Sequence, residues 1–217
     1  MDTGQWVVIG LSALMGVWFA LGTLYNRRRG VATYRWLVSG VIYMGEISEK
    51  AWIGSSGTGA RLVVGKAKAP FQRVEVILLL ESREILPIWL FNRVRKKQDE
   101  IILRADLHNA PSQEVEVAHP RDRQFRALLK EKDQWVFEQL PHQERLLLAY
   151  RGPESGGGLT RLTAFLDQYR TTVHRISLRR KKPHLVIRAY LPPLQEHSVK
   201  EFFISVEQLV SSRAVSR

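Results

Sequence analysis

The chain has 217 residues, no cysteine and a formal net charge of +12, from 33 Lys and Arg against 21 Asp and Glu. The absence of cysteine excludes disulfides, thiolate metal sites and cysteine catalysis. An apolar content of 45% with 25% charged residues is typical of a folded protein rather than a disordered one. The positive balance favours partners with negative charge, such as an anionic leaflet, an acidic protein or a nucleic acid.

An uncharged apolar segment occupies residues 6–25 and is followed closely by Arg27, Arg28 and Arg29. Twenty residues at about 1.5 Å each form a helix of about 30 Å, the thickness of a bilayer's hydrocarbon core. Residues 1–5 hold no Lys or Arg, and no small-residue cleavage site follows, so the pattern indicates an anchor rather than a cleaved signal. The positive-inside rule predicts a short N-terminus outside the cell membrane and a cytoplasmic C-terminal domain.

Small residues recur every four positions within this segment, at Ser12, Gly16 and Ala20. They would line one stripe of a helix, and such a stripe permits two backbones to approach closely in a homodimer. The alternative is that small residues are simply common in membrane helices.

Residues 26–47 are expected to form a basic, amphipathic juxtamembrane segment. Apolar residues from Tyr34 to Met44 fall at helical spacing on one side. This pattern predicts a short amphipathic helix that lies along the membrane surface or packs on the domain.

Residues 48–120 are expected to form a β-rich subdomain, because apolar and polar residues alternate there. The alternation predicts strands over 61–66, 72–81, 100–107 and 114–118. Apolar residues on both sides of 72–81 predict a strand in the centre of a mostly antiparallel sheet.

Residues 121–217 are expected to form an α/β subdomain. The patterns predict a helix over 121–132, strands over 135–140 and 144–150, and a helix with apolar positions from Leu159 to Val173. Two further strands precede a last helix, which a capping box of Ser198 and Glu201 begins. The order β-α-β-β-α is most of a ferredoxin-like unit. The predicted fold class is therefore α+β, with one N-terminal transmembrane helix.

A first basic cluster in the soluble part adjoins an apolar block. Residues 86–91 include Trp89, and Arg93, Arg95, Lys96 and Lys97 follow. This composition is typical of a helix that docks on an anionic membrane surface. The alternative is a short buried helix whose basic residues complement its C-terminal dipole.

A second basic cluster is expected at the tip of a hairpin and comprises Arg179, Arg180, Lys181 and Lys182. Arg175, Arg188 and Tyr190 would share a sheet face beside Arg179. The arrangement predicts an anion-binding face for lipid headgroups, an acidic partner or RNA, or else a solvated turn. Because Tyr190 is the only good candidate for base stacking, nucleic acid is the weakest of these partners.

No residue spacing in the sequence points to a catalytic site, a cofactor or a metal. The glycine-rich segment 54–59 lacks the Lys-Ser/Thr ending of a phosphate-binding loop, and the histidines do not show the spacing of a helical zinc site. His174 and His184 fall on neighbouring predicted strands, without a nearby acid. We therefore expect a non-catalytic membrane-anchored adaptor or assembly module that binds a protein partner. A tethered enzyme whose site forms only in three dimensions and a tethered nucleic-acid binder are the alternatives.

Overall fold

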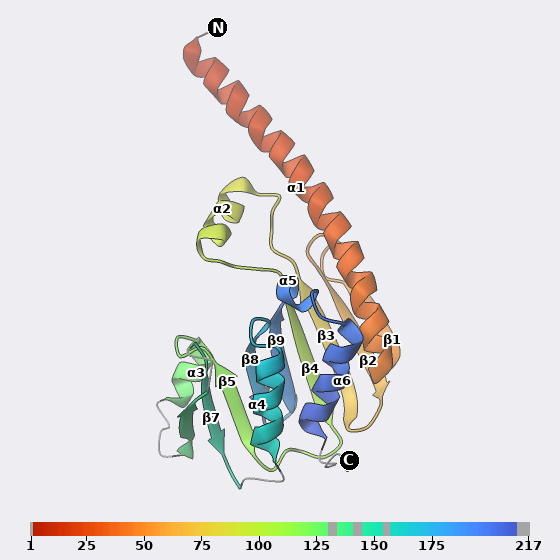
Figure 1. Ribbon diagram of the computed structural model, residues 1–217. Coiled ribbons are helices and arrows are strands. Elements are labelled where there is room, and N and C mark those ends of the chain that lie inside the picture. Colours follow the sequence, from red (N-terminus) through yellow and green to blue (C-terminus); the bar gives the residue numbers. More distant parts are fainter. Residues whose placement is uncertain (1, 130–133, 141–144, 154–156, 212–217) are drawn as a thin grey trace.

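A long helix projects from a domain that is built on a single sheet (Figure 1). This computed structural model describes residues 2–129, 134–140, 145–153 and 157–211. The sheet has nine strands in the order β1-β2-β3-β4-β9-β8-β5-β7-β6, and every neighbouring pair is antiparallel. The predicted α+β class, with an N-terminal helix and an antiparallel sheet, is therefore confirmed.

The strands follow the alternation of apolar and polar residues closely in the centre of the sheet. Their bounds are β1 (Gly45–Trp52), β2 (Gly59–Ala67), β3 (Phe71–Leu79), β4 (Glu100–Leu107), β5 (Glu114–Ala118), β6 (Val136–Gln139), β7 (Leu147–Arg151), β8 (Val173–Leu178) and β9 (Leu185–Tyr190).

Helices cover one face of this sheet and leave most of the other open (Figure 1). The covering elements are the C-terminal part of α1 (Thr3–Val41), α4 (Gly158–Gln168) and α6 (Val199–Val210). The shorter elements are the 3-10 helix η1 (Ile42–Met44), α2 (Leu86–Val94), α3 (Arg123–Leu128) and α5 (Leu191–Leu194). Of these, α3 packs on the opposite face of the sheet, against β5 and β7.

The hydrophobic core lies between the covered face and the three helices. Leu103 of β4 is 1% exposed, whereas its neighbour Ile102 points to the other face of the sheet and is half-buried. Aromatic rings pack against one another in this core. The ring of Tyr169, directly after α4, lies 5.3 Å from that of Phe202 in α6. A Cβ atom at Gly40 of α1 would lie 2.4 Å from Val199 of α6, so this glycine allows the two helices to pack closely.

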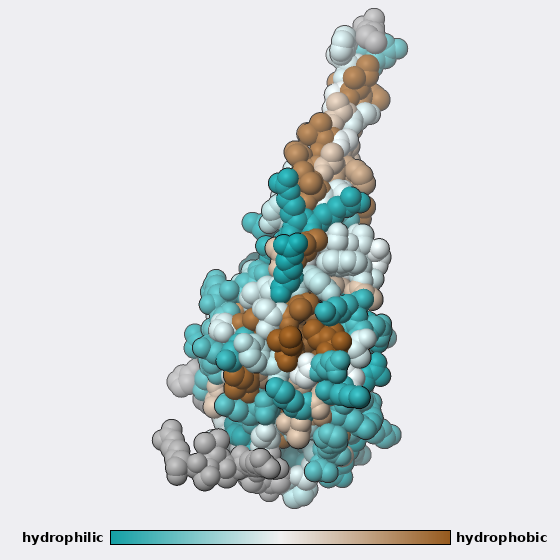
Figure 2. Space-filling model, turned by 90° about the vertical axis from the view of Figure 1, so that its right-hand side faces the viewer, coloured by the Kyte–Doolittle hydropathy of each residue, from teal (hydrophilic) through white to brown (hydrophobic). Residues whose placement is uncertain are grey.

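The helix α1 differs from the expected arrangement, because it continues through the juxtamembrane segment without a break. Leu37 and Val41 pack into the core, so residues 30–41 lie on the domain rather than along a membrane surface. The N-terminal part includes a strongly apolar stretch of 18 residues, none of which is buried. Figure 2 shows apolar side chains along this projecting part. It is long and apolar enough to cross a membrane.

Several predicted boundaries were wrong. Helix α4 ends at Gln168 rather than near Val173, because Tyr169 turns into the core and accepts the N–H groups of Thr172 and Val173. The Ser198 side chain makes no capping hydrogen bond, so the predicted capping box is absent. Strand β1 was not predicted.

The order of the strands interleaves the two predicted subdomains. Strand β5 lies between β8 and β7, and β4 pairs with β9, so the boundary at residue 120 falls within one continuous sheet. Strands β7 and β8 are both antiparallel to β5 and therefore run parallel to each other, with α4 as their connection. The relation to a ferredoxin-like fold stays a prediction.

Candidate functional site: a basic groove on the open sheet face

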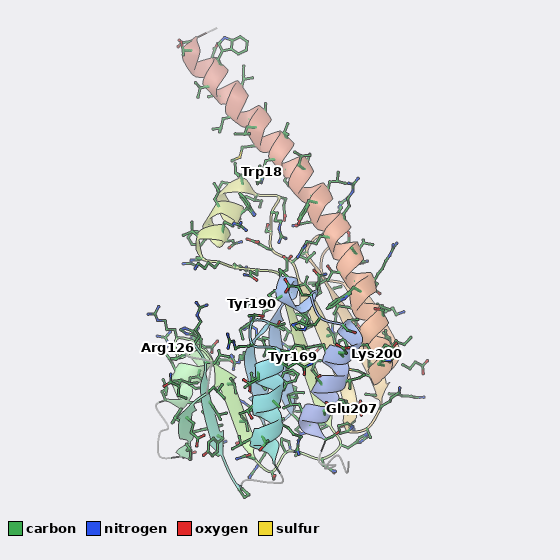
Figure 3. The ribbon with its side chains drawn as sticks, viewed as in Figure 1. Trp18, Arg126, Tyr169, Tyr190, Lys200 and Glu207 are labelled. Atoms are coloured by element: carbon green, nitrogen blue, oxygen red, sulfur yellow. The ribbon has the colours of Figure 1, made fainter. Side chains whose placement is uncertain are left out.

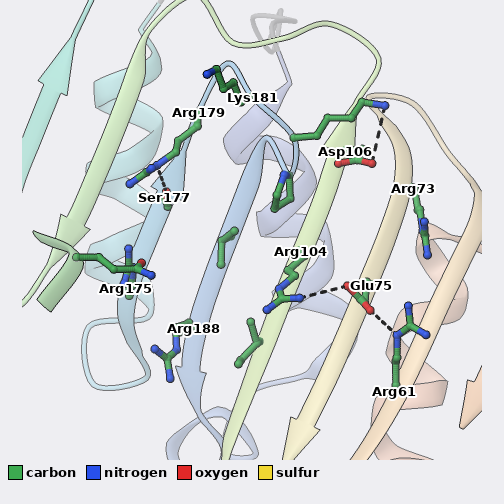
Figure 4. Close-up of a pocket in the computed structure, with 15 residues that line it drawn as sticks. Arg61, Arg73, Glu75, Arg104, Asp106, Arg175, Ser177, Arg179, Lys181 and Arg188 are labelled. Atoms are coloured by element: carbon green, nitrogen blue, oxygen red, sulfur yellow. Dashed lines mark hydrogen bonds and ion pairs between the residues drawn. The ribbon is translucent and has the colours of Figure 1, made fainter. Parts of the chain in front are cut away.

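A groove of about 920 Å³ lies on the open face of the sheet, across β2, β3, β4, β9 and β8 (Figure 4). Two acidic residues, Glu75 and Asp106, line it, together with eight basic ones. We call these eight the basic groove: Arg61, Arg73, Arg104, Arg175, Arg179, Lys181, Lys182 and Arg188.

The groove follows from the same alternation that builds the core. On β4, Leu103 and Ala105 face the helices, so Ile102, Arg104 and Asp106 face the groove. Ile102 and Val186 give the groove an apolar floor between the charged side chains. At one side α3 forms a wall, with Gln124 in the lining.

Carboxylates on the same face hold the arginines in place. Glu75 forms ion pairs with Arg61 and, at 3.8 Å, with Arg104. The fully buried Glu116 binds Arg175 and lies 3.1 Å from the guanidinium of Arg179. Arg61, Arg175 and Arg179 each donate a hydrogen bond to one of these carboxylates, so their remaining N–H groups are presented in a defined direction.

A third carboxylate organises the groove at its other end. Glu100 accepts two hydrogen bonds from Arg188, at 2.6 and 2.8 Å, and lies 2.9 Å from His174 Nε2. Burial by itself raises the pKa of Glu100, but the hydrogen bonds from His174 and Arg188 outweigh it and lower the pKa below its ordinary value. The ring of His174 stacks on Tyr190 at 4.3 Å, which covers the only aromatic residue that the sequence suggested for base stacking.

Two cations of the groove stand apart from these ion pairs. Arg73 and Lys181 are exposed and form no ion pair with any residue in the described ranges. Their neighbour Lys182 lies 3.9 Å from Asp106 and donates to Gln72 at 2.7 Å. The end of the groove near the β8–β9 hairpin therefore offers cations with little internal compensation.

Three of the four residues in the second predicted cluster line the groove. Arg179, Lys181 and Lys182 line the groove together with Arg175 and Arg188. Arg180 is the exception, because its guanidinium donates to the carbonyl of Ser112 at 2.6 Å and its backbone N–H donates to Glu114. The role of the residues in the groove as an anion-binding face stays a prediction.

The sequence interpretation did not select Arg61, Arg73 or Arg104. Their signal was present, since each occupies a strand position that faces away from the apolar positions of β2, β3 or β4. Only the pairing of these strands with β9 and β8 brings them to the same surface as the hairpin cluster.

The three arginines after the apolar segment have different environments. Arg27 and Arg28 are exposed, whereas the guanidinium of Arg29 donates to the buried Asp99 at 2.6 Å. Arg29 is therefore paired with a carboxylate of the domain while its side chain stays partly exposed, and its contact with lipid stays a prediction. Asp99 is also bound by Arg83, and these contacts lower its pKa in spite of its burial.

The first predicted cluster lies on and after α2, away from the groove. Trp89 is half-buried against Trp18 of α1, and Arg93, Arg95, Lys96 and Lys97 are exposed. The stripe of Ser12, Gly16 and Ala20 is uncovered in the single chain, since a Cβ atom at Gly16 would meet nothing within 4 Å. Self-association through this stripe stays a prediction.

His174 of β8 and His184, directly before β9, have different hydrogen-bond partners. His184 is buried and its Nδ1 accepts the backbone N–H of Leu107, while His174 binds Glu100. Among the described residues, no three His, Asp or Glu side chains gather as they would around a metal ion. No protein-family model matches the sequence, and no curated protein is similar to it. The chemistry of the groove itself is therefore the basis for a functional proposal.

Proposed function

We propose that the protein is a single-pass membrane-anchored, non-catalytic adaptor whose basic groove binds an acidic segment of a partner protein in the cytoplasm. The observation that carries the proposal is the groove of eight cations on the face of the sheet that the helices leave open. The apolar part of α1 supplies the anchor. The exposed Arg27 and Arg28 support an orientation with the domain in the cytoplasm.

The ordered arginines favour recognition of carboxylates. A guanidinium presents several N–H groups in a fixed plane and can bind a carboxylate through two parallel hydrogen bonds. Since Glu75, Glu116 and Glu100 already hold their arginines, an acidic partner would order few additional side chains on binding. This lowers the entropic cost of association.

The position of the hairpin favours a soluble partner over lipid. Strand β9 leads from the hairpin to α5, where Leu191 donates to the carbonyl of Asp99, the residue that Arg29 binds. The hairpin cations therefore lie farther from the anchor by the length of a six-residue strand, about 20 Å. Screening at physiological salt acts beyond about 8 Å, so a leaflet at the level of Arg29 attracts these cations weakly.

The residues that line the groove also favour an acidic protein over single-stranded nucleic acid as the partner. Recognition of single strands relies on aromatic side chains on which bases stack. The residues that line the groove include no aromatic side chain, and the ring of Tyr190 is stacked on His174. Ile102 and Val186 instead provide an apolar floor that suits the side chains of a peptide.

The test is binding of a labelled polyglutamate peptide to the full chain in phosphatidylcholine nanodiscs. The double variant Arg73→Glu/Lys181→Glu reverses two exposed charges that take part in no described ion pair, so the fold is expected to remain intact. We expect its affinity to fall by about tenfold or more. The matched control is Arg170→Glu/Lys50→Glu, at two exposed residues that do not line the groove, and it should retain most of the affinity.

Three results would contradict the proposal in different ways. Equal loss of affinity in both double variants would show that net charge, not the groove, binds the peptide. Tighter binding of an RNA homopolymer than of the peptide, lost in Arg73→Glu/Lys181→Glu, would make the protein a nucleic-acid binder. Recovery of the full chain in the soluble fraction of cells would show that the apolar part of α1 does not anchor the protein in a membrane.

A further inference from the structure

The helix α2 lies beside the projecting part of α1 and stands away from the rest of the domain (Figures 1 and 3). The centroids of the Trp89 and Trp18 rings are 5.0 Å apart. The indole Nε1 of Trp18 also donates to the carbonyl of Arg83 at 2.9 Å. Both contacts are made by a residue in the middle of the apolar segment 6–25.

Gly22 of α1 lies directly against the residues that lead into α2. A Cβ atom at Gly22 would lie 2.6 Å from the carbonyl oxygen of Arg83 and 2.8 Å from Cα of Glu84. Any larger residue there would displace residues 83–84. By contrast, a Cβ atom at Gly10 or Gly16 would meet nothing within 4 Å, so this close approach is specific to the turn that holds α2.

These contacts set the depth of α2 along the anchor. Trp18 precedes Tyr25 by seven residues, which is about 10 Å along a helix. If residues 6–25 span a hydrocarbon core of about 30 Å, Trp18 lies inside the leaflet nearer to the domain. A helix that packs against Trp18 must then lie in that leaflet too, where lipid is its surroundings.

The surface of α2 matches that environment. Among its exposed side chains are Ile88 (45%), Leu90 (50%), Phe91 (55%) and Val94 (83%). In water this concentration of exposed apolar side chains on one short helix is unfavourable. The basic residues Arg93, Arg95, Lys96 and Lys97 lie at its C-terminal end and beyond, where they can reach anionic headgroups.

Several polar groups in the chain between the sheet and α2 are paired, although Glu81 Oε1 is buried without a hydrogen-bond partner among the described residues. Asn26 Nδ2 donates to the carbonyl of Glu81 at 2.9 Å, and Arg83 donates to Asn26 Oδ1 at 3.1 Å. Arg83 also binds both oxygens of Asp99, at 3.0 Å each. Pairing of this kind lets irregular backbone approach a hydrocarbon boundary, where unpaired polar groups are costly.

We propose that α2 is embedded in the leaflet nearer to the domain, seated on α1 through Trp18 and Gly22, with its exposed apolar residues against acyl chains. This proposal rests on the membrane anchor of the proposed function. It extends that function, because a second membrane contact fixes the orientation of the domain and of its basic groove relative to the bilayer.

The chain contains no cysteine, so single cysteines can be labelled in the full protein without background. We would place an environment-sensitive fluorophore at Leu90→Cys on α2, Leu14→Cys on α1 and Val136→Cys on β6. Each of these residues is at least half exposed. Two measurements follow in vesicles with phosphatidylglycerol and phosphatidylcholine: quenching by aqueous iodide and quenching by lipids with a nitroxide on the acyl chain.

We expect the Leu90→Cys and Leu14→Cys probes to be quenched by the nitroxide lipids and protected from iodide, and the Val136→Cys probe to behave in the opposite way. A Leu14→Cys probe in lipid with a Leu90→Cys probe in water would overturn the inference and leave the anchor intact. If the Leu14→Cys probe is also in water, the anchor of the proposed function fails, and the inference fails with it.

A second variant tests the contact of Gly22 with residues 83–84. In Gly22→Leu the Leu90→Cys probe should lose quenching by nitroxide lipids, while Gly16→Leu should leave it unchanged, because of these two glycines Gly22 alone lies against residues 83–84. Unchanged quenching in both variants would contradict the role of Gly22 in holding α2 at this depth.

Discussion

The two faces of the nine-stranded sheet are made by alternating residues of the same strands, yet they differ in polarity and in exposure. One face is apolar and covered by α1, α4 and α6, with Leu103, Ile187 and Val76 at 1% exposure. The other is charged and open from β2 to β8, and its arginines are held by carboxylates.

This difference separates stability from recognition. The covered face contributes apolar burial, which is the dominant favourable term in folding. The open face contributes an ordered array of charges, since each carboxylate fixes the direction of the arginines beside it. Substitutions on the two faces should therefore have different consequences.

The largest effect should come from removing a core side chain on β4. Leu103→Ala leaves a cavity in a fully buried site and should lower the free energy of unfolding by about 2–5 kcal/mol. The matched change on the open face, Ile102→Ala, should lower it by about 1 kcal/mol or less, because Ile102 is only half-buried. Urea unfolding of both variants checks the difference, and equal losses would show that the open face is also part of the core.

A smaller effect should come from the buried carboxylate of the open face. Glu116→Gln removes the charge that holds Arg175 and Arg179, and should cost about 1–3 kcal/mol because Arg175 is nearly buried. Polyglutamate binding should weaken as well, since the two arginines lose their fixed direction.

The matched control for this change is Glu49→Gln. Its ion pair with Arg61 is exposed, and such pairs contribute about 0–1 kcal/mol. Thermal unfolding compares the two variants. A larger loss for Glu49→Gln than for Glu116→Gln would contradict the idea that burial makes the arginine array rigid.

The smallest effect should appear as a pH dependence of stability that originates on the open face. The folded protein holds the pKa of Glu100 below the ordinary 4.5, so this group stabilises the fold above about pH 4.5. The stabilisation is lost as the pH falls through the lowered pKa, because protonation removes the ion pair with Arg188. Glu114 acts in the same direction, through the N–H of Arg180 and the guanidinium of Arg151.

The measurement is the urea midpoint between pH 7 and pH 3 for the wild type and Glu100→Gln. The variant should have a flatter profile below pH 4.5, and the two profiles should run in parallel at higher pH. Identical slopes at acid pH would mean that Glu100 does not contribute through its charge.

Local patterns predicted the centre of the sheet well. Strands β4 and β5 have the bounds that the alternation predicts. In β4 every second residue is buried, whereas all five residues of β5 are buried, because Glu114 and Glu116 are covered by the arginines that they bind. Patterns failed where distant contacts decide. Tyr169 continues the helical spacing of α4 but ends the helix, since its ring packs against Phe165 and Phe202.

The candidate site was predicted in part, for a related reason. The hairpin cluster and Arg188 lie close together in sequence, so their common face followed from alternation alone. Arg61, Arg73 and Arg104 join them through the pairing of β4 with β9, which no local pattern shows. The pairing of Arg29 with Asp99 was not predicted, because Asp99 lies seventy residues along the chain.

The apolar N-terminal helix, the positive charge and the alternation of the main strands can be read from local sequence, because hydrophobicity and side-chain period are properties of neighbouring residues. Local sequence does not show which face of the sheet the helices cover, and therefore which cations remain in the open groove, because this depends on contacts between distant elements. The contacts of Gly22 and Trp18 with the chain that leads into α2 also depend on the tertiary structure, since they join backbone segments some sixty residues apart.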